Sequence, residues 1–322
     1  MHSDQSKSEV SPERRLSVII PAMNAARTLA PLLDDLLALQ MPPGWDVEFI
    51  ASYTASHDDT LAILESRPVR IVRCTTIGCG AARNAAVPEA TGSLLHFIDA
   101  DARPVGNDFF FRLIRAAEEL ERDDKFGGFG GPILLDRSQR RNPIAQADHF
   151  ACWFNWTALR KSGESKLFQP TVSLVVRRSV YEALNGFDPR LRVLEDFDFH
   201  QRAVAAGYRF YFVQDCAVTH RARDTILLSW RHSWYWGAPF RSAYLEKVGE
   251  NKFRIPPESR WFWINLPVIY LRRLRLVLRS ARRVSTRKTL VSLPFIAVTV
   301  FSWSLASAVG REQPSLETPP AV

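Results

Sequence analysis

The chain has 322 residues, of which 46% are hydrophobic and 24% are charged. This composition is that of a folded protein and excludes a chain that is disordered throughout. A formal net charge of +8 indicates an anionic partner, such as nucleic acid, an acidic membrane surface or a phosphate-bearing substrate. Much of the excess charge lies in residues 270–289, where arginines alternate with leucine and valine, which favours a membrane surface over nucleic acid.

The first fifteen residues contain no apolar run of the signal-peptide type, so we expect a mobile polar lead over residues 1–15. The cysteines form no CxxC pair and no zinc-like spacing, and we interpret them as reduced thiols of a cytosolic domain. They are Cys74, Cys79, Cys152 and Cys216.

Apolar runs and amphipathic runs alternate along the first half of the chain. We predict strands over residues 16–22, 47–52, 68–74 and 94–101, with helices over residues 28–40, 58–66 and 80–90 between them. Strands that are apolar throughout and alternate with helices indicate an α/β fold with a mostly parallel, Rossmann-like sheet flanked by helices. The second half is less regular, with a predicted strand over residues 170–178 and a helix from residue 195. We expect one globular domain over residues 16–225.

In such a sheet, ligands collect at the carboxyl ends of the strands, which here are residues 21–24, 53–58 and 99–101. The last of these ends holds the triplet Asp99-Ala100-Asp101. Two carboxylates at a buried strand end can hold a hard divalent cation that bridges phosphates. Acids are also common in turns, so the triplet alone leaves both interpretations open.

A second acidic pair, Glu195 and Asp196, opens the predicted helix of the second half. Acids in a first helical turn are favoured by the helix dipole, which is one interpretation of the pair. The other is catalytic, because a single activated carboxylate can act as general base for a hydroxyl that attacks a sugar in one direct displacement. A retaining mechanism needs a paired nucleophile and acid/base, and no such pair can be assigned.

Taken together, the motifs LSVIIPAMNAARTLAPLLDDLL, GAARNAA, FIDADARP and VSLVVRRSVYEALNGFDPRLRVLEDFDF resemble glycosyltransferase family two, which has the GT-A fold. The resemblance covers residues 16–220, about two thirds of the chain. The C-terminal part is similar to bacterial members that carry a membrane helix after the catalytic domain.

The resemblance implies an enzyme that uses a nucleotide-sugar donor with Mg²⁺ or Mn²⁺, and it implies roles for individual residues. Asp99 and Asp101 match the metal-binding acids, Asp196 matches the general base, and Glu195 would support it. His220 matches a histidine that reaches the metal in some related enzymes, although a structural histidine is the alternative. The residues that match the donor side are Pro21, Ala22, Met23, Asn24, Arg83, Asn84 and Asp99.

One stretch departs from the family pattern. Where the second strand commonly ends in an acidic pair, this chain has Tyr53 and Thr54. The lost charge-assisted hydrogen bond to the donor is worth roughly 1.5–3 kcal/mol. We expect Tyr53 to stack on a base, Thr54 to hydrogen-bond to it, and Asp58 to replace part of the lost contact.

Residues 289–310 carry no charge and follow Arg287 and Lys288. At about 1.5 Å per residue they just span a hydrocarbon core, so we predict a transmembrane helix, with a buried C-terminal helix as the alternative. The positive-inside rule then places the catalytic domain on the cytoplasmic face of the membrane and the tail, residues 311–322, outside. We expect the aromatic and basic stretch 226–288 to form membrane-interface helices.

The leading hypothesis is therefore an inverting, metal-dependent glycosyltransferase that acts on a lipid-linked or cell-envelope glycan precursor. Because of Tyr53 and Thr54, a catalytically impaired, membrane-anchored binding or assembly protein is the alternative. A sugar nucleotidyltransferase is disfavoured because no glycine-rich basic loop lies near the N-terminus. Nucleic-acid binding is the least favoured function.

Overall fold

The computed structural model describes residues 14–239, 255 and 259–309. Most of the predicted lead, part of the predicted interface region and the predicted tail lie outside these residues. The chain divides into two compact units. The first holds residues up to 100 together with 104–130 and 163–216, and the second holds 101–103, 131–162 and the residues from 217 onward. Two internal segments, 101–103 and 131–162, thus group with the C-terminal helices.

An eight-stranded, mostly parallel sheet forms the centre of the first unit. In spatial order its strands are β3 (Arg70–Cys74), β2 (Asp46–Thr54), β1 (Arg15–Ala22), β4 (Leu94–Ile98), β9 (Ser173–Arg177), β6 (Phe126–Gly130), β10 (Arg209–Phe212) and β8 (Gly163–Glu164). The pairs β1–β2, β1–β4, β2–β3 and β6–β10 are parallel. Strand β9 runs antiparallel to both of its neighbours. The strands and the fold class expected from the sequence are confirmed, apart from this reversal.

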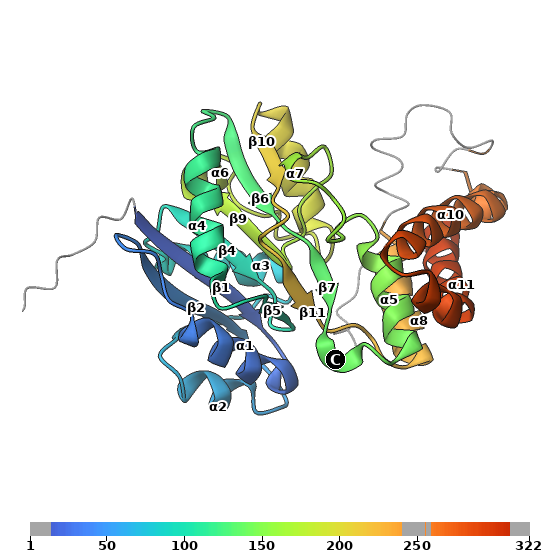
Figure 1. Cartoon of the computed structure of the whole chain (residues 1–322), viewed down its shortest axis with the longest axis horizontal. Coiled ribbons are helices and arrows are strands. Elements are labelled where there is room, and N and C mark those ends of the chain that lie inside the picture. The colour runs from blue at the N-terminus through green and yellow to red at the C-terminus, as the bar shows by residue number, and fades with distance from the viewer. Residues whose placement is uncertain (1–13, 240–254, 256–258, 310–322) are drawn as a thin grey trace, which may run out of the picture. The chain divides into compact units, whose positions relative to one another are not determined.

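Helices cover both faces of this sheet. They are α1 (Ala26–Ala38), α2 (Thr60–Glu65), α3 (Cys79–Ala86), α4 (Phe109–Leu120), α6 (Arg178–Ala183) and α7 (Glu195–Ala205), with a 3₁₀ turn at Val87–Glu89. Successive residues of a strand point to opposite faces. On β4, His96 contacts Phe109 of α4, whereas Phe97 packs against Tyr181 and Phe187 on the other face. Figure 1 shows α4 lying across the near face of the sheet.

The second unit is mainly helical. Its helices are α5 (Pro143–Trp153), α8 (Ile226–Gly237), α10 (Leu266–Val284) and α11 (Thr286–Val309), with 3₁₀ turns at Arg137–Gln139 and Phe262–Asn265, the latter labelled η4. Its strands are β5 (Ala102–Pro104), β11 (Val218–His220) and β7 (Ile133–Leu135), in that spatial order. Helix α11 packs against α5, α8 and α10. Within the described ranges it is the one helix long and apolar enough to cross a membrane, but half of its most apolar stretch is buried against protein.

Candidate active site

Arg83 on α3 joins two carboxylates that come from distant parts of the chain. Its guanidinium donates to Glu195 Oε1 at 2.7 Å and to Asp99 Oδ1. The Arg83 side chain is fully buried, and helices α3 and α7 approach closely because position 80 is glycine: a Cβ there would lie 3.1 Å from the Cβ of Glu195. Removing one of these side chains would leave a buried charge without its partner, so the three depend on one another, and we call them the Arg83 unit.

Asp196 stands at the start of α7, immediately after Glu195. Its Oδ1 accepts from the amide of Phe197 at 2.7 Å and its Oδ2 accepts from the amide of Thr171 at 3.3 Å. Burial, together with the charge of Glu195, raises the pKa of Asp196 to about 7, against the opposing effect of Arg83 and the two amides. A carboxylate that titrates near neutral pH can accept a proton from a hydroxyl and release it again.

Glu195 differs from Asp196 in its partner. The side chain is buried, and this burial raises its pKa although Arg83 opposes the shift. Its Oε1 is held by Arg83. Glu195 therefore supports Arg83, and through it Asp99, while Asp196 is the carboxylate with the freedom to exchange a proton.

The two acids of the Asp99-Ala100-Asp101 triplet have different environments. Asp99 directly follows β4, and its side chain is 27% exposed although it accepts from Arg83. Asp101 is more enclosed: His220 Nε2 lies 3.3 Å from its Oδ1, and the Arg223 guanidinium lies 3.7 Å from its Oδ2. Burial alone would raise the pKa of the Asp101 carboxyl, but His220 and Arg223 hold it well below its usual range. Asp101 is thus an anion across the physiological pH range.

Asp101 and His220 can hold a divalent cation between them. A carboxylate oxygen and an imidazole nitrogen that face one another at 3.3 Å fit a metal that accepts both ligand types. Mg²⁺ takes mainly oxygen ligands, so Asp101 is the more usual ligand of the two for that ion and the His220 imidazole is the less usual one. Arg223 adds a positive charge beside the pair, and the sequence analysis did not single it out, although it lies only three residues after His220.

At the donor side, Asn24 connects the ends of β1 and β2. Its backbone amide donates to Ser56 Oγ at 3.0 Å, and its side-chain oxygen accepts from the amide of His57 at 2.9 Å. Asn24 has a positive φ of 49°, a conformation that asparagine tolerates better than most residues. Asn24 therefore shapes the loop that follows β2, and Pro21, Ala22 and Met23 lead into it from β1.

Tyr53 and Thr54 are both buried at the end of β2. The Tyr53 hydroxyl accepts from the amide of Ser56 at 3.1 Å, and the exposed Arg73 places its guanidinium 5.7 Å from the centre of the Tyr53 ring. Tyr53 is therefore part of the loop's support. Arg73 is the exposed side chain beside Tyr53. Sequence reasoning did not select it, because the only feature that could have pointed to it was its position near the end of β3.

Two residues have their polar atoms committed to the protein itself. Asp58, expected to replace part of the missing donor contact, accepts from the amide of Ala26 and from both the amide and the hydroxyl of Thr60. Asn84, expected near the donor, holds the turn at Phe187 through that residue's amide and carbonyl, and it also accepts from the Tyr181 hydroxyl. Both side chains therefore organise the backbone around them.

A further cluster lies between α5 and α8. Asp148 Oδ1 and Cys152 Sγ both approach the same nitrogen of His232, at 3.2 Å and 3.9 Å. Asp148 also accepts from the Ser229 hydroxyl and the amide of Arg223. A catalytic relay needs its acid and its nucleophile on opposite ring nitrogens. We therefore interpret the cluster as a polar joint between two helices.

These features define a class of protein: an α/β nucleotide-dependent transferase fold with acids at the ends of the central strands. The model of the family "Glycosyl transferase family 2" matches residues 17–184, just over half of the chain. The chain belongs to glycosyl transferase family 2.

Related proteins agree with this assignment. The O-antigen biosynthesis protein RfbC of Myxococcus xanthus is 26% identical over 64% of this chain and 17% of its own length. The glycosyltransferase AglE of Haloferax volcanii is 25% identical over 65% of this chain and 67% of its own. The chain therefore spans only a small part of RfbC and about two thirds of AglE.

Solved structures share the GT-A fold with this chain. The mannosyltransferase PcManGT from Pyrobaculum calidifontis, in complex with GDP-Man and Mn²⁺, has a TM-score of 0.57 at 20% identity over 94% of this chain and 89% of its own. The S. aureus protein TarS, residues 1–349 in complex with UDP-GlcNAc, has a TM-score of 0.50 at 15% identity over 91% and 90%. At these identities the likeness concerns the fold.

Proposed function

We propose that this protein is an inverting, metal-dependent glycosyltransferase that transfers a sugar from a nucleotide-sugar donor to an acceptor hydroxyl. The observation that carries the proposal is Asp196, a buried carboxylate with a pKa raised to about 7, fixed by two backbone amides beside the Arg83 unit. A base of this kind is the one protein group that a single displacement at a sugar carbon requires.

In this mechanism Asp196 takes the proton of the acceptor hydroxyl as its oxygen attacks the anomeric carbon. The bond from that carbon to the donor phosphate breaks on the opposite face, so the configuration inverts and a nucleoside diphosphate leaves. Glu195 is buried and its Oε1 is held by Arg83, so we assign it a supporting role and propose no covalent intermediate on it.

Asp101 and His220 would hold the divalent cation. A cation held there would supply positive charge for the diphosphate leaving group. Arg223 brings a second positive charge next to Asp101, which suits the same diphosphate.

The acceptor we propose is a lipid-linked or cell-envelope glycan precursor at the cytoplasmic face of the membrane. The role of the relative RfbC in O-antigen biosynthesis supports this class of acceptor, and so does the concentration of arginines in the C-terminal helices.

The test is a transfer assay with purified full chain, a panel of UDP-, GDP-, dTDP- and ADP-sugars, and Mn²⁺ or Mg²⁺. We expect one donor class to support transfer with inversion, and Asp196→Asn to remove transfer while donor binding by calorimetry persists. Retention of configuration, or full activity in Asp196→Asn, would overturn the mechanism.

The impaired binding protein is the second candidate, and the buried Tyr53-Thr54 pair is the observation that favours it. It predicts no metal-dependent binding of any nucleotide sugar and no turnover in any acceptor mixture. Release of free nucleoside diphosphate in the presence of acceptor would eliminate it.

A further inference from the structure

From Thr289 onward, the serine and threonine side chains of α11 are buried in the protein. Ser302 donates to the carbonyl of Trp230 and Ser307 to the carbonyl of Gly237, each at 2.8 Å. Ser292 donates to Gln146 Oε1 at 3.3 Å, and Thr299 lies in hydrogen-bond distance of Ser229 at 3.0 Å. These contacts attach α11 along its length to α5 and α8.

The contact between α8 and α11 is too close to admit lipid. A Cβ at Gly237 would lie 2.4 Å from the carbonyl oxygen of Trp303, so the two backbones touch. Helices α5 and α8 have 11 and 12 residues, about 17–18 Å of rise, and cannot span a hydrocarbon core beside α11. Helix α5 also carries the buried Asp148, which forms hydrogen bonds with Ser229 and His232 of α8. One side of α11 is therefore covered by two short helices, α5 and α8, which carry polar side chains.

The opposite side of α11 is exposed and apolar. Leu290 is 60% exposed and Val291 57%. Large apolar side chains are also exposed along η4 and α10. We call this set the apolar face: Trp261, Trp263, Ile264, Val268, Leu271, Leu276, Leu290, Val291, Leu293, Val298, Phe301 and Val309. Hydroxyls inside and large apolar side chains outside invert the usual arrangement of a water-soluble helix. A face of this kind marks an interaction surface.

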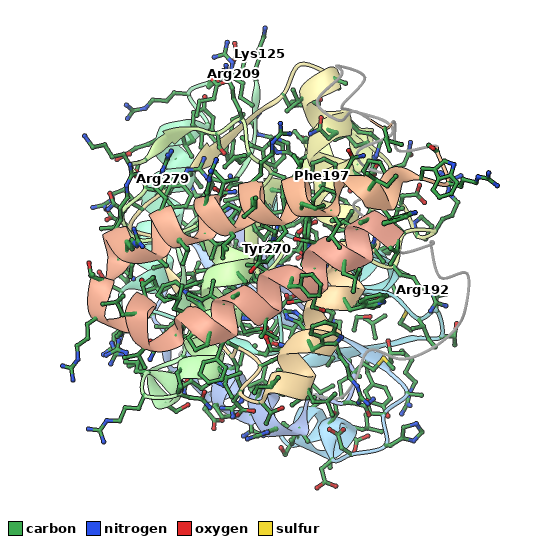
Figure 2. The ribbon with its side chains drawn as sticks, turned by 90° about the vertical axis from the view of Figure 1, so that its right-hand side faces the viewer. Lys125, Arg192, Phe197, Arg209, Tyr270 and Arg279 are labelled. Carbon is green, nitrogen blue, oxygen red and sulfur yellow. The ribbon has the colours of Figure 1, made fainter. Side chains whose placement is uncertain are left out.

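Helices α10 and α11 lie side by side, as Figure 2 shows for the two salmon-coloured ribbons, and Tyr270 of one contacts Phe301 of the other. The apolar face is accompanied by cations. Residues 259–309 contain nine arginines and lysines and neither aspartate nor glutamate. Those that are exposed on α10 and at the start of α11 are Arg272, Arg275, Arg279, Arg282, Arg283, Arg287 and Lys288.

We propose that η4, α10 and α11 dock on an anionic lipid membrane with the apolar face turned into it, and that α11 lies along the surface and does not cross the bilayer. Exposed apolar side chains enter the boundary between headgroups and acyl chains, while arginines meet lipid phosphates. Charge complementarity selects the occupant, because an uncharged apolar partner would offer no counter-charge to the exposed cations of α10 and the start of α11, and nucleic acid would leave the apolar face in water.

Vesicle flotation of the full chain tests the docking surface without requiring transferase activity. We expect strong binding to vesicles of phosphatidylcholine with phosphatidylglycerol, little binding to phosphatidylcholine alone, and weakening with salt. The triple variant Arg275→Gln, Arg279→Gln, Arg282→Gln should bind roughly 100-fold more weakly, at about 1 kcal/mol per arginine. Its matched control removes three exposed cations elsewhere, Arg122→Gln, Lys125→Gln, Arg141→Gln, and should bind like the wild type.

The apolar contribution is tested in the same way. Trp261→Ser, Trp263→Ser, Leu271→Ser should reduce binding at least tenfold, whereas Leu159→Ser, Leu167→Ser, Val204→Ser, which are also exposed, should not. Circular dichroism and thermal melting of each variant establish that it is folded. Equal binding to neutral vesicles, or equal loss in test and control variants, would overturn the docking surface.

The position of a tag fused after Val322 distinguishes docking from spanning. If α11 lies along the surface, the tag stays on the same side of the membrane as the catalytic domain. In inverted vesicles that side faces outward, so added protease should digest the tag as well as the catalytic domain. Alkaline carbonate should then release the protein. A tag protected inside inverted vesicles, on a protein that carbonate does not release, would show that α11 crosses the bilayer and would overturn the inference.

Discussion

Arg83 donates to Glu195 at 2.7 Å although 112 residues separate them in the chain. The same guanidinium holds Asp99 at the end of β4, so one buried cation connects the donor-side acid with the start of α7. This relationship places Asp196, the next residue, in a fixed position relative to Asp99 within the first unit.

Arg83→Met should destabilise the protein strongly, because it leaves Glu195 buried without its counter-charge. Removing one partner of a buried pair costs about 3–5 kcal/mol. Urea denaturation measures the effect, and Arg67→Met is the control, since Arg67 pairs with Asp34, whose side chain is 64% exposed, and its loss should cost less than about 1 kcal/mol. Equal losses in the two variants would show that the Arg83 unit is not a stability element.

The pH profile of transfer should follow Asp196. With a pKa of about 7 in the free enzyme, kcat/KM should rise as the pH increases through about 7, because only the deprotonated carboxylate accepts the proton. Asp196→Asn should reduce kcat/KM for transfer at least a thousandfold. Asp198→Asn, on the same helix and paired with Arg202, is the control and should keep both the rate and the profile.

Stability should show the opposite dependence on pH. The folded pKa of Asp196 lies above its ordinary value of 3.8, so its protonated form stabilises the fold below that value, and this contribution is lost as the pH rises through about 7. Asparagine mimics the protonated acid. The Tm of Asp196→Asn, relative to the wild type, should therefore increase between about pH 5 and about pH 8, and a constant difference across this range would contradict the raised pKa.

Metal dependence should be carried by Asp101 and His220. Chelator should abolish transfer. In Asp101→Asn or His220→Gln, the increase in donor affinity that Mn²⁺ causes should be at least tenfold smaller than in the wild type, as measured by calorimetry with and without the ion. Asp124→Asn, at an exposed acid in the turn before β6, is the control. Unchanged Mn²⁺ dependence in both variants would remove the pair from the metal site.

The position of Tyr53 predicts how the donor loop responds to a restored acid. Tyr53→Asp places a carboxylate next to Arg73 and removes the hydroxyl that accepts from Ser56. We expect the KM for the donor, or the preference among nucleotides, to change several-fold while kcat changes little. Tyr53→Phe removes only the hydroxyl and separates the two effects, and a large fall in kcat with unchanged donor binding would contradict the assignment.

Much of the first unit could be predicted from local pattern. The run Leu16–Ala22 forms a strand because its buried β-branched residues favour extended backbone, and the structure extends it by a single residue. The reversal of β9 could not be predicted, because an apolar run that is buried on both faces reads the same in parallel and antiparallel pairing. Strands β5 and β7 have three residues each, too few for a period of two to appear.

The sequence by itself determined which residue types stand at the strand ends and at the start of α7, because strand and helix periodicity are local properties of the chain. Only the tertiary structure decided what those residues do. Burial sets the pKa of Asp196, Arg83 selects Glu195 across 112 residues, and the packing of α11 on α5 and α8 turns a run that reads as a membrane span into a helix with one protein face. Dielectric environment, distant pairing and the covering of a helix face depend on the neighbours that folding brings together, and these neighbours leave no trace in local spacing.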